Sequence, residues 1–264
     1  MDFSFINDLT QALNSNNIYQ FSFTGAKILA LGLLALKVLE MFVKENFDNQ
    51  ELKIGNLASL LGYGLVIMSS DWIITTIENA FAGVDVAMQN TSSNLYKELD
   101  DLIRKKVDEM VDGAEDGWDY AGVILSNFFV MVSMIVTMIL GGLCKIADLS
   151  ITASYLVQRV FILQLLKFLF PLAIALSTYS GTQKLFHSWI LRYIGIFILG
   201  IAYIGIIKAT SLLQQSLLNQ FGADNSFNDG MAFSAGILIT MIVTFTIKVK
   251  LFSSVTSYVM GMFQ

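Results

Sequence analysis

This sequence contains very little of what most catalytic or disulfide-stabilised proteins depend on. Its 264 residues include one cysteine, one histidine and one proline. A single thiol, Cys144, excludes an internal disulfide framework. One histidine and one cysteine do not supply the ligands of a zinc cluster or a Cys–His catalytic pair, and no glycine-rich phosphate loop follows a strand-like segment. We therefore expect neither an enzyme nor a bound cofactor or metal.

Charged residues are also scarce, at 14% of the chain compared with about 25% in soluble domains. Hydrophobic residues make up 55%, and they gather in runs that approach the roughly 20 apolar residues a membrane-spanning helix needs. Alternating, strand-like patterns are few. These features predict an all-α polytopic integral membrane protein, organised as a single membrane domain over residues 1–264.

Six apolar runs account for most of the hydrophobic residues. The sixth is followed by a short amphipathic tail. The runs cover residues 28–43, 57–77, 121–143, 151–178, 189–209 and 231–252. They predict five or six membrane-embedded helices, because the run at 151–178 has two interpretations.

The run at 151–178 contains Pro171, whose ring removes a helical hydrogen bond and clashes with the preceding turn. If this run enters and leaves the membrane on one side, or lies along the interface, Lys145, Lys184 and Arg192 fall on the same side as the other basic residues, which matches the positive-inside rule. The N-terminus and the acidic loop described below then lie outside, and the C-terminus lies inside. The alternative is an ordinary span with a proline kink. We favour the broken segment.

Two polar segments complete the chain. Residues 1–24 have no basic residue and do not look like a secretory signal, so we expect them to be retained as an interfacial segment. Residues 78–119 are rich in acids and place apolar residues from Leu95 to Val111 at helical spacing. This pattern predicts an extramembrane amphipathic helix whose apolar stripe needs a partner. Residues 120–264 form the hydrophobic C-terminal half.

Five charged residues lie within the first, second and fourth apolar runs. Lys37 and Glu40 are three residues apart and can pair on one helical face. Asp71 lies in the second run, and Arg159 and Lys167 lie in the fourth. Such charges usually face protein or water. They indicate either an ion pathway or, as we favour, pairing between helices, snorkelling or contact with lipid head groups of the bilayer.

The stretch from residue 167 to 195 gathers the rare residues. It contains Pro171 in "FPLAIAL", then the short loop "STYSGTQKLFHS", then Trp189 and Arg192 in "WILRYI". This order of features resembles the TrbL family of polytopic inner-membrane subunits of bacterial type IV secretion systems. The resemblance covers about residues 121–210, and the layout of the whole chain is also similar.

The resemblance implies a non-enzymatic platform or channel component in the bacterial inner membrane, with its N-terminus and the 78–119 loop in the periplasm. It implies a homo-oligomeric ring that holds periplasmic stalk and scaffold subunits and helps a protein or DNA substrate to pass. Pro171 would then break a helix at an assembly or gating position, and Trp189 and Arg192 would anchor a span at the cytoplasmic face. The alternative is a small-molecule or ion transporter that uses intramembrane charges such as Asp71.

Overall fold

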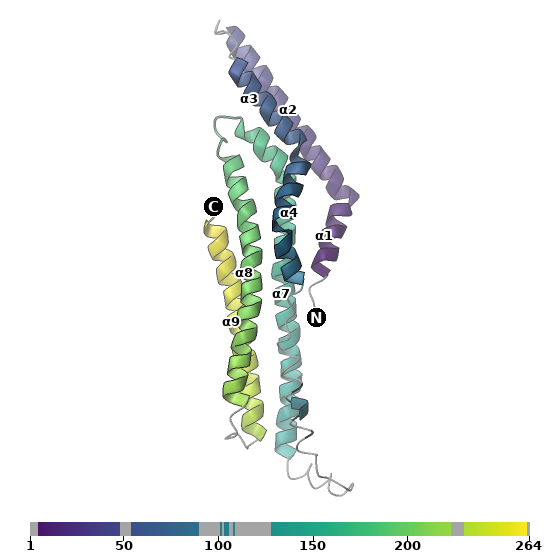
Figure 1. The fold of residues 1–264 in the computed structure, drawn as a ribbon, viewed down its shortest axis with the longest axis vertical. Helices are drawn as coiled ribbons and strands as arrows, with labels where there is room; N and C mark the ends of the chain where they lie inside the picture. The colour runs from purple at the N-terminus through teal and green to yellow at the C-terminus, as the bar shows by residue number, and fades with distance from the viewer. Residues whose placement is uncertain are drawn as a thin grey trace. The chain divides into compact units, whose positions relative to one another are not determined.

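The protein is built from long helices. The computed structural model describes residues 5–47, 54–89, 101, 103–105, 108, 128–222 and 230–262. The longer elements among these residues are α1 (Phe5–Ser15), α2 (Asn17–Phe47), α3 (Ile54–Met68), α4 (Ser70–Gln89), α7 (Phe128–Ser177), α8 (Leu185–Gly222) and α9 (Gly230–Met262) (Figure 1). The described residues contain no strand, which confirms the all-α prediction.

Three of these helices are long and apolar enough to cross a membrane, judged by length and composition. They are Phe128–Ser177, Leu185–Gln220 and Ser234–Met262, and the bent pair Gly55–Met68 and Ser70–Val84 adds a fourth if it counts as one span. A polytopic membrane protein is therefore confirmed. Within the described residues the count is three or four spans rather than the five or six predicted.

Two differences explain the lower count. The described part of the run at 121–143 and almost all of the run at 151–178 belong to one continuous helix, because α7 extends from Phe128 to Ser177 without interruption. The polar residues between the runs lower the local hydropathy, but they do not stop helical hydrogen bonding. The run at 28–43 lies inside α2, which is not among the spanning candidates and which carries Lys27, Lys37, Glu40 and Lys44.

The break in the apolar helices lies at a different place from the one predicted. Pro171 stands inside α7 and does not end it. The sharp bend, of 61°, instead falls at Ser69, between α3 and α4. The hydroxyl of Ser69 donates a hydrogen bond to the carbonyl of Leu65 at 2.8 Å, and such bonds to the fourth preceding carbonyl often bend helices. The second run, and not the fourth, is therefore the broken one.

The acid-rich segment predicted at 78–119 begins inside a helix, since residues 78–89 belong to α4. Most of its amphipathic stripe lies outside the described residues. Ile103, which is described, is only 3% exposed and packs in a core cluster with Met134, Leu218, Ile237 and Met241. At this position the chain itself covers the stripe, while Asp101, Arg104, Lys105 and Asp108 are exposed.

The contacts of the chain divide it into two compact units. One unit contains residues 1–3, 90–155 and 202–255, and the other contains residues 4–89, 156–201 and 256–264. The single domain over residues 1–264 stays a prediction.

In the first unit, α7 and α9 run parallel. Their contacts advance together along both helices, at Ser133 with Ser234, Gly141 with Met241, Asp148 with Lys248 and Tyr155 with Phe252. At Gly141 the approach is close, because a Cβ atom there would lie 2.6 Å from Cε of Met241. The Nζ atom of Lys248 lies 2.9 Å from a carboxylate oxygen of Asp148, and both side chains are almost completely buried.

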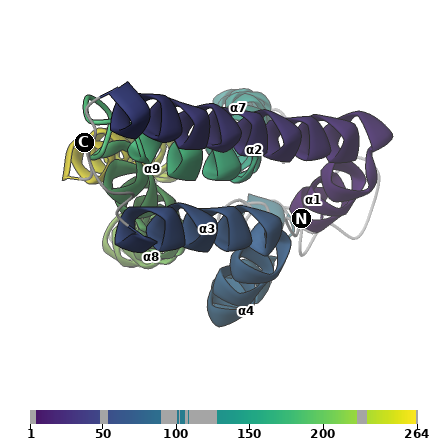
Figure 2. The ribbon, with the colours of Figure 1, turned by 90° about the horizontal axis from the view of Figure 1, so that it is seen from above.

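In the second unit, α2 packs against α1 and α3. Figure 2 shows α2 and α3 lying alongside each other, with α4 leaving α3 at an angle. The segments of α7 and α8 between residues 156 and 201 complete this unit. All eight residues singled out from the sequence as candidates for assembly or gating lie here, so the candidate site is described within this unit alone.

Candidate functional site

Two carboxylates of α4 each form an ion pair with a lysine from another helix. Asp71 lies 2.5 Å from Nζ of Lys27 on α2, and Glu78 forms an ion pair with Lys167 on α7. Because Asp71 and Glu78 are seven residues apart, they lie on one face of α4. The pairs therefore tie α4 to α2 and to α7.

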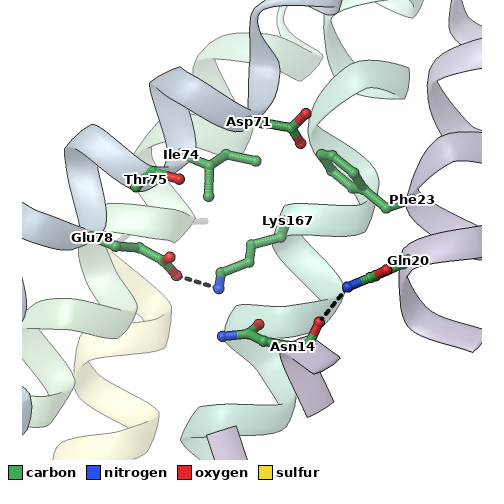
Figure 3. Close-up of a pocket in the computed structure, with 8 residues that line it drawn as sticks. All are labelled: Asn14, Gln20, Phe23, Asp71, Ile74, Thr75, Glu78 and Lys167. Carbon is green, nitrogen blue, oxygen red and sulfur yellow. Dashed lines mark hydrogen bonds and ion pairs between the residues drawn. The ribbon is translucent and has the colours of Figure 1, made fainter. Parts of the chain in front are cut away.

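A cleft of about 250 Å³ opens where these helices meet. It is lined by Asn14, Gln20, Phe23, Asp71, Ile74, Thr75, Glu78 and Lys167. Figure 3 shows Lys167 reaching towards Glu78 across the cleft and Gln20 bonded to Asn14. Gln164 on α7 also donates to the side-chain oxygen of Asn14 at 2.9 Å. Polar contacts thus join α1, α2, α4 and α7 around one space.

The two ion pairs differ in their exposure to solvent. The side chain of Lys167 is 9% exposed and that of Glu78 is 33% exposed, whereas Asp71 is 68% exposed. Exposed ion pairs contribute about 0–1 kcal/mol, while removing one partner of a buried pair costs about 3–5 kcal/mol. The bond between Lys167 and Glu78 is therefore the more important one for the position of α4.

Arg159 is buried in the same unit, at 2% exposure. Its Nε donates to the backbone carbonyl of Ile196 at 3.2 Å, and its guanidinium lies over the ring of Phe197, with Cζ 5.7 Å from the centroid. Gly200 leaves room for this group, because a Cβ atom there would lie 2.7 Å from Nε. The expectation that intramembrane charges face protein holds for Arg159 and Lys167.

Pro171 and Trp189 are joined through the turn that precedes the proline. Pro171 has no N–H to donate, and its ring loosens that turn. The indole N–H of Trp189 donates to the carbonyl of Leu166 in the same turn at 2.7 Å. Trp189 is 5% exposed and stacks on Tyr193, with ring centroids 4.9 Å apart. Trp189 therefore stabilises the part of α7 that precedes Pro171 by a hydrogen bond from α8.

The two side chains predicted to form an interfacial anchor differ in their exposure. Trp189 is buried and Arg192 is exposed, and their role as an anchor stays a prediction. The sequence could not show this, because a tryptophan near the end of an apolar run suits both an interface and a helix contact.

Lys37 and Glu40 form the pair that their spacing predicted, at 3.0 Å. Glu40 also pairs with Lys44 at 2.7 Å, and the hydrogen bonds from Lys44 and Lys37 lower the pKa of Glu40 below its usual value. Nζ of Lys37 lies 5.0 Å from the ring centroid of Tyr179, whose hydroxyl donates to the carbonyl of Leu33 at 2.8 Å. This cluster holds the loop after α7 against α2.

The structure thus groups six of the eight candidates in three places. Asp71 and Lys167 line one cleft, Lys37 and Glu40 form another cluster, and Trp189 of α8 bonds to Leu166, which precedes Pro171 in α7. Sequence reasoning missed Glu78, although its spacing of seven residues from Asp71 is a usable signal. It also missed the pairing of Lys27 with Asp71, which are 44 residues apart in the sequence.

The described residues contain no group of three or more His, Cys, Asp or Glu side chains that could hold a metal ion. What the cleft offers is a set of charges and amides that can exchange hydrogen-bond partners. Such an arrangement suits holding or releasing a helix.

Comparison with known proteins adds one finding. A family model described as TrbL/VirB6 plasmid conjugal transfer protein matches residues 28–250. The matched region includes all eight candidate residues and most of the length of the chain. No curated protein matches the chain.

Proposed function

Because this chain belongs to the TrbL/VirB6 plasmid conjugal transfer family, we propose that it is a non-enzymatic platform or channel component of a type IV secretion machine in the bacterial inner membrane. The family match over residues 28–250 is the observation that carries the proposal. Helices that are long and apolar enough to cross a membrane agree with it.

The platform role assigns partner subunits to the periplasmic side of the membrane. In this proposal the N-terminus and the 78–119 loop lie in the periplasm, where stalk and scaffold subunits assemble on a homo-oligomeric ring. The exposed charges of Asp101, Arg104, Lys105 and Asp108 give that loop a polar surface suited to contact other subunits. A protein or DNA substrate would pass through or beside the ring.

The gating role falls on α4. The bend at Ser69 separates α4 from α3, and the two ion pairs hold α4 against α2 and α7. Release of Lys167 from Glu78 would free one face of α4. The other candidates do not line the cleft and would keep the neighbouring helices in place, namely Lys37, Glu40, Arg159, Pro171, Trp189 and Arg192. The cleft is thus the part of the unit best suited to change between two states.

A transfer assay with charge variants tests this role. A strain that lacks the gene is complemented with Lys167→Glu, with Glu78→Lys, or with both. Each single change places two like charges together and should reduce transfer, and the double exchange should restore it because the pair re-forms. Lys208→Glu serves as the control, because Lys208 is exposed on α8 and lies outside the cleft. A membrane-fractionation blot reports insertion for every variant.

If both single variants insert and transfer normally, the pair does not control α4. If the double exchange inserts but does not recover, the site acts through the individual side chains rather than through their pairing.

The second candidate function is a small-molecule or ion transporter. It is favoured by one observation, that Asp71 and Glu78 line a cleft together with Lys167. Purified protein in liposomes should then accumulate a solute against a gradient, and Asp71→Asn should abolish the uptake. A platform component shows no such uptake on its own.

A further inference from the structure

A second and larger cavity lies in the same unit, between α2, α3 and the connection from α7 to α8. Its volume is about 560 Å³, within the range of about 300–1,000 Å³ that small-molecule sites occupy. It is lined by Lys37, Met41, Asn56, Ser59, Leu60, Tyr63, Ser177, Thr178, Gln183, Phe186 and His187. None of these side chains is an acid.

Among the residues that line this cavity, Lys37 is the one lysine, arginine or acid. Lys37 shares the carboxylate of Glu40 with Lys44, at 3.0 Å and 2.7 Å. Glu40 therefore divides its carboxylate between two lysines and is itself outside the lining. The 250 Å³ cleft differs, because two acids, Asp71 and Glu78, line it. The larger cavity is therefore the one suited to an anion.

The polar lining offers both donors and acceptors. Lys37, Asn56, Tyr63, Gln183 and His187 can donate to phosphate oxygens. The hydroxyls of Ser59, Ser177 and Thr178 donate to carbonyls of their own helix or turn, at 3.0, 2.6 and 2.7 Å. Their oxygens are thereby presented as acceptors, which suits a ligand that carries its own hydroxyl groups next to its phosphate.

The rest of the lining and the surface around it are apolar. Met41, Leu60 and Phe186 face the cavity. Large apolar side chains are exposed on the two helices that border it, namely Leu36 and Leu39 on α2 and Leu61 and Leu65 on α3. A free anion makes no favourable contact with these leucines, whereas the acyl chains of a lipid can pack along them.

We propose that this cavity binds the head group of an anionic glycerophospholipid, with the phosphate at Lys37 and the acyl chains along the exposed leucines of α2 and α3. Basic pockets between membrane helices are known to take acidic lipid head groups. The bound lipid would join α2 and α3 to the loop at Tyr179, which already contacts α2. The inference rests on the cavity and does not depend on the proposed role in transfer.

The test uses the full chain, purified in mild detergent and freed of lipid. Phosphatidylglycerol, phosphatidylcholine and inorganic phosphate are titrated separately, and binding is followed by native mass spectrometry and by the rise in unfolding temperature that a ligand of the folded state produces. Phosphatidylglycerol should bind more tightly than phosphatidylcholine, and inorganic phosphate should neither stabilise the protein nor displace the lipid.

Two variants perturb the cavity in different ways. Lys37→Gln removes its charge and should weaken phosphatidylglycerol binding about fivefold, because a lysine near an anionic lipid surface contributes on the order of that factor. Ser59→Trp fills the cavity without changing charge and should abolish binding. The matched controls are Lys208→Gln and Ser154→Trp, which change exposed residues elsewhere and should bind like the unmodified chain.

Three results would overturn the proposal. Equal binding of the two lipids, or unchanged binding in either cavity variant while its helicity is intact, would show that the cavity does not select the head group. Displacement of the lipid by inorganic phosphate would assign the site to a free anion. Dissociation of a lipid-free oligomer by Ser59→Trp, but not by Ser154→Trp, would assign the cavity to a second copy of this chain.

Discussion

The buried ion pair between Asp148 and Lys248 offers the sharpest test of how α7 and α9 are held together. The charged atoms are 2.9 Å apart, and the two side chains are only 2% and 1% exposed. At an effective dielectric constant of about 20, two unit charges at this distance attract each other by about 6 kcal/mol. Most of that attraction offsets the cost of removing both charges from water. The net effect of losing one partner should therefore be about 3–5 kcal/mol.

Lys248→Met should lower the unfolding temperature by about 6–20 °C, since about 2–4 °C correspond to each kcal/mol in a domain of this size. Asp148→Leu should do the same. The double variant should be close to the unmodified chain, because an apolar pair can replace a buried ion pair at little cost. Lys250→Met is the matched control, since Lys250 is exposed two residues further along α9.

The measurement is thermal unfolding in detergent, followed by circular dichroism with one scan rate for all variants. If the losses of the two single variants simply add in the double variant, the side chains do not act as a pair. A single variant that is as stable as the control would refute the burial on which the magnitude depends.

Three further predictions concern the second unit. Gly200→Ala should lower the unfolding temperature by about 2–12 °C, from about 1–3 kcal/mol of overpacking against the buried guanidinium, whereas Gly205→Ala, where a Cβ meets nothing within 4 Å, should be neutral or stabilising. Trp189→Phe should cost about 0.5–1.5 kcal/mol, because it removes the indole hydrogen bond to the carbonyl of Leu166, while Trp72→Phe at an exposed position should cost almost nothing. The carboxylate of Glu40 should titrate in an NMR experiment below the usual range for glutamate, so that its contribution to stability is complete above the ordinary pKa and is lost as the pH falls through the lowered pKa.

Hydropathy located the helices well but placed their ends poorly. Within the described residues, the apolar runs are helical apart from the break at Ser69 and the last residue of the run at 151–178, because a helix satisfies the backbone polar groups internally where water is absent. A drop in hydropathy, however, says nothing about the backbone. Lys145 and Asp148 interrupt the apolar pattern and suggested a loop, yet both are compatible with a helix, so α7 continues through them.

The position of the bend shows the same limit. Proline was expected to break a helix, but Pro171 is accommodated in α7 beside Trp189. The actual bend, at Ser69, has a weaker signal in the sequence, which is two serines followed by Asp71. Such residues often start helices, so "SSD" within an apolar run could have marked the start of α4.

Ion pairs within one helix can be predicted from the sequence, whereas ion pairs between helices cannot. The pair of Lys37 and Glu40 followed from helical spacing alone. The partners Glu78 and Lys167 are 89 residues apart, and Asp148 and Lys248 are 100 residues apart. Only the packing of helices brings such residues together, and no spacing rule reveals it.

The parallel pairing of α7 and α9 has a consequence for the order of events during synthesis. Lys248 leaves the ribosome 100 residues after Asp148, which at about 5–20 residues per second means about 5–20 s. For that time the carboxylate of the growing chain has no ammonium partner from α9, while the apolar length of α7 already favours entry into the bilayer. Until then the carboxylate of Asp148 must contact water, lipid head groups or the insertion machinery. Asp148 can be buried against α9 only after Lys248 has been synthesised.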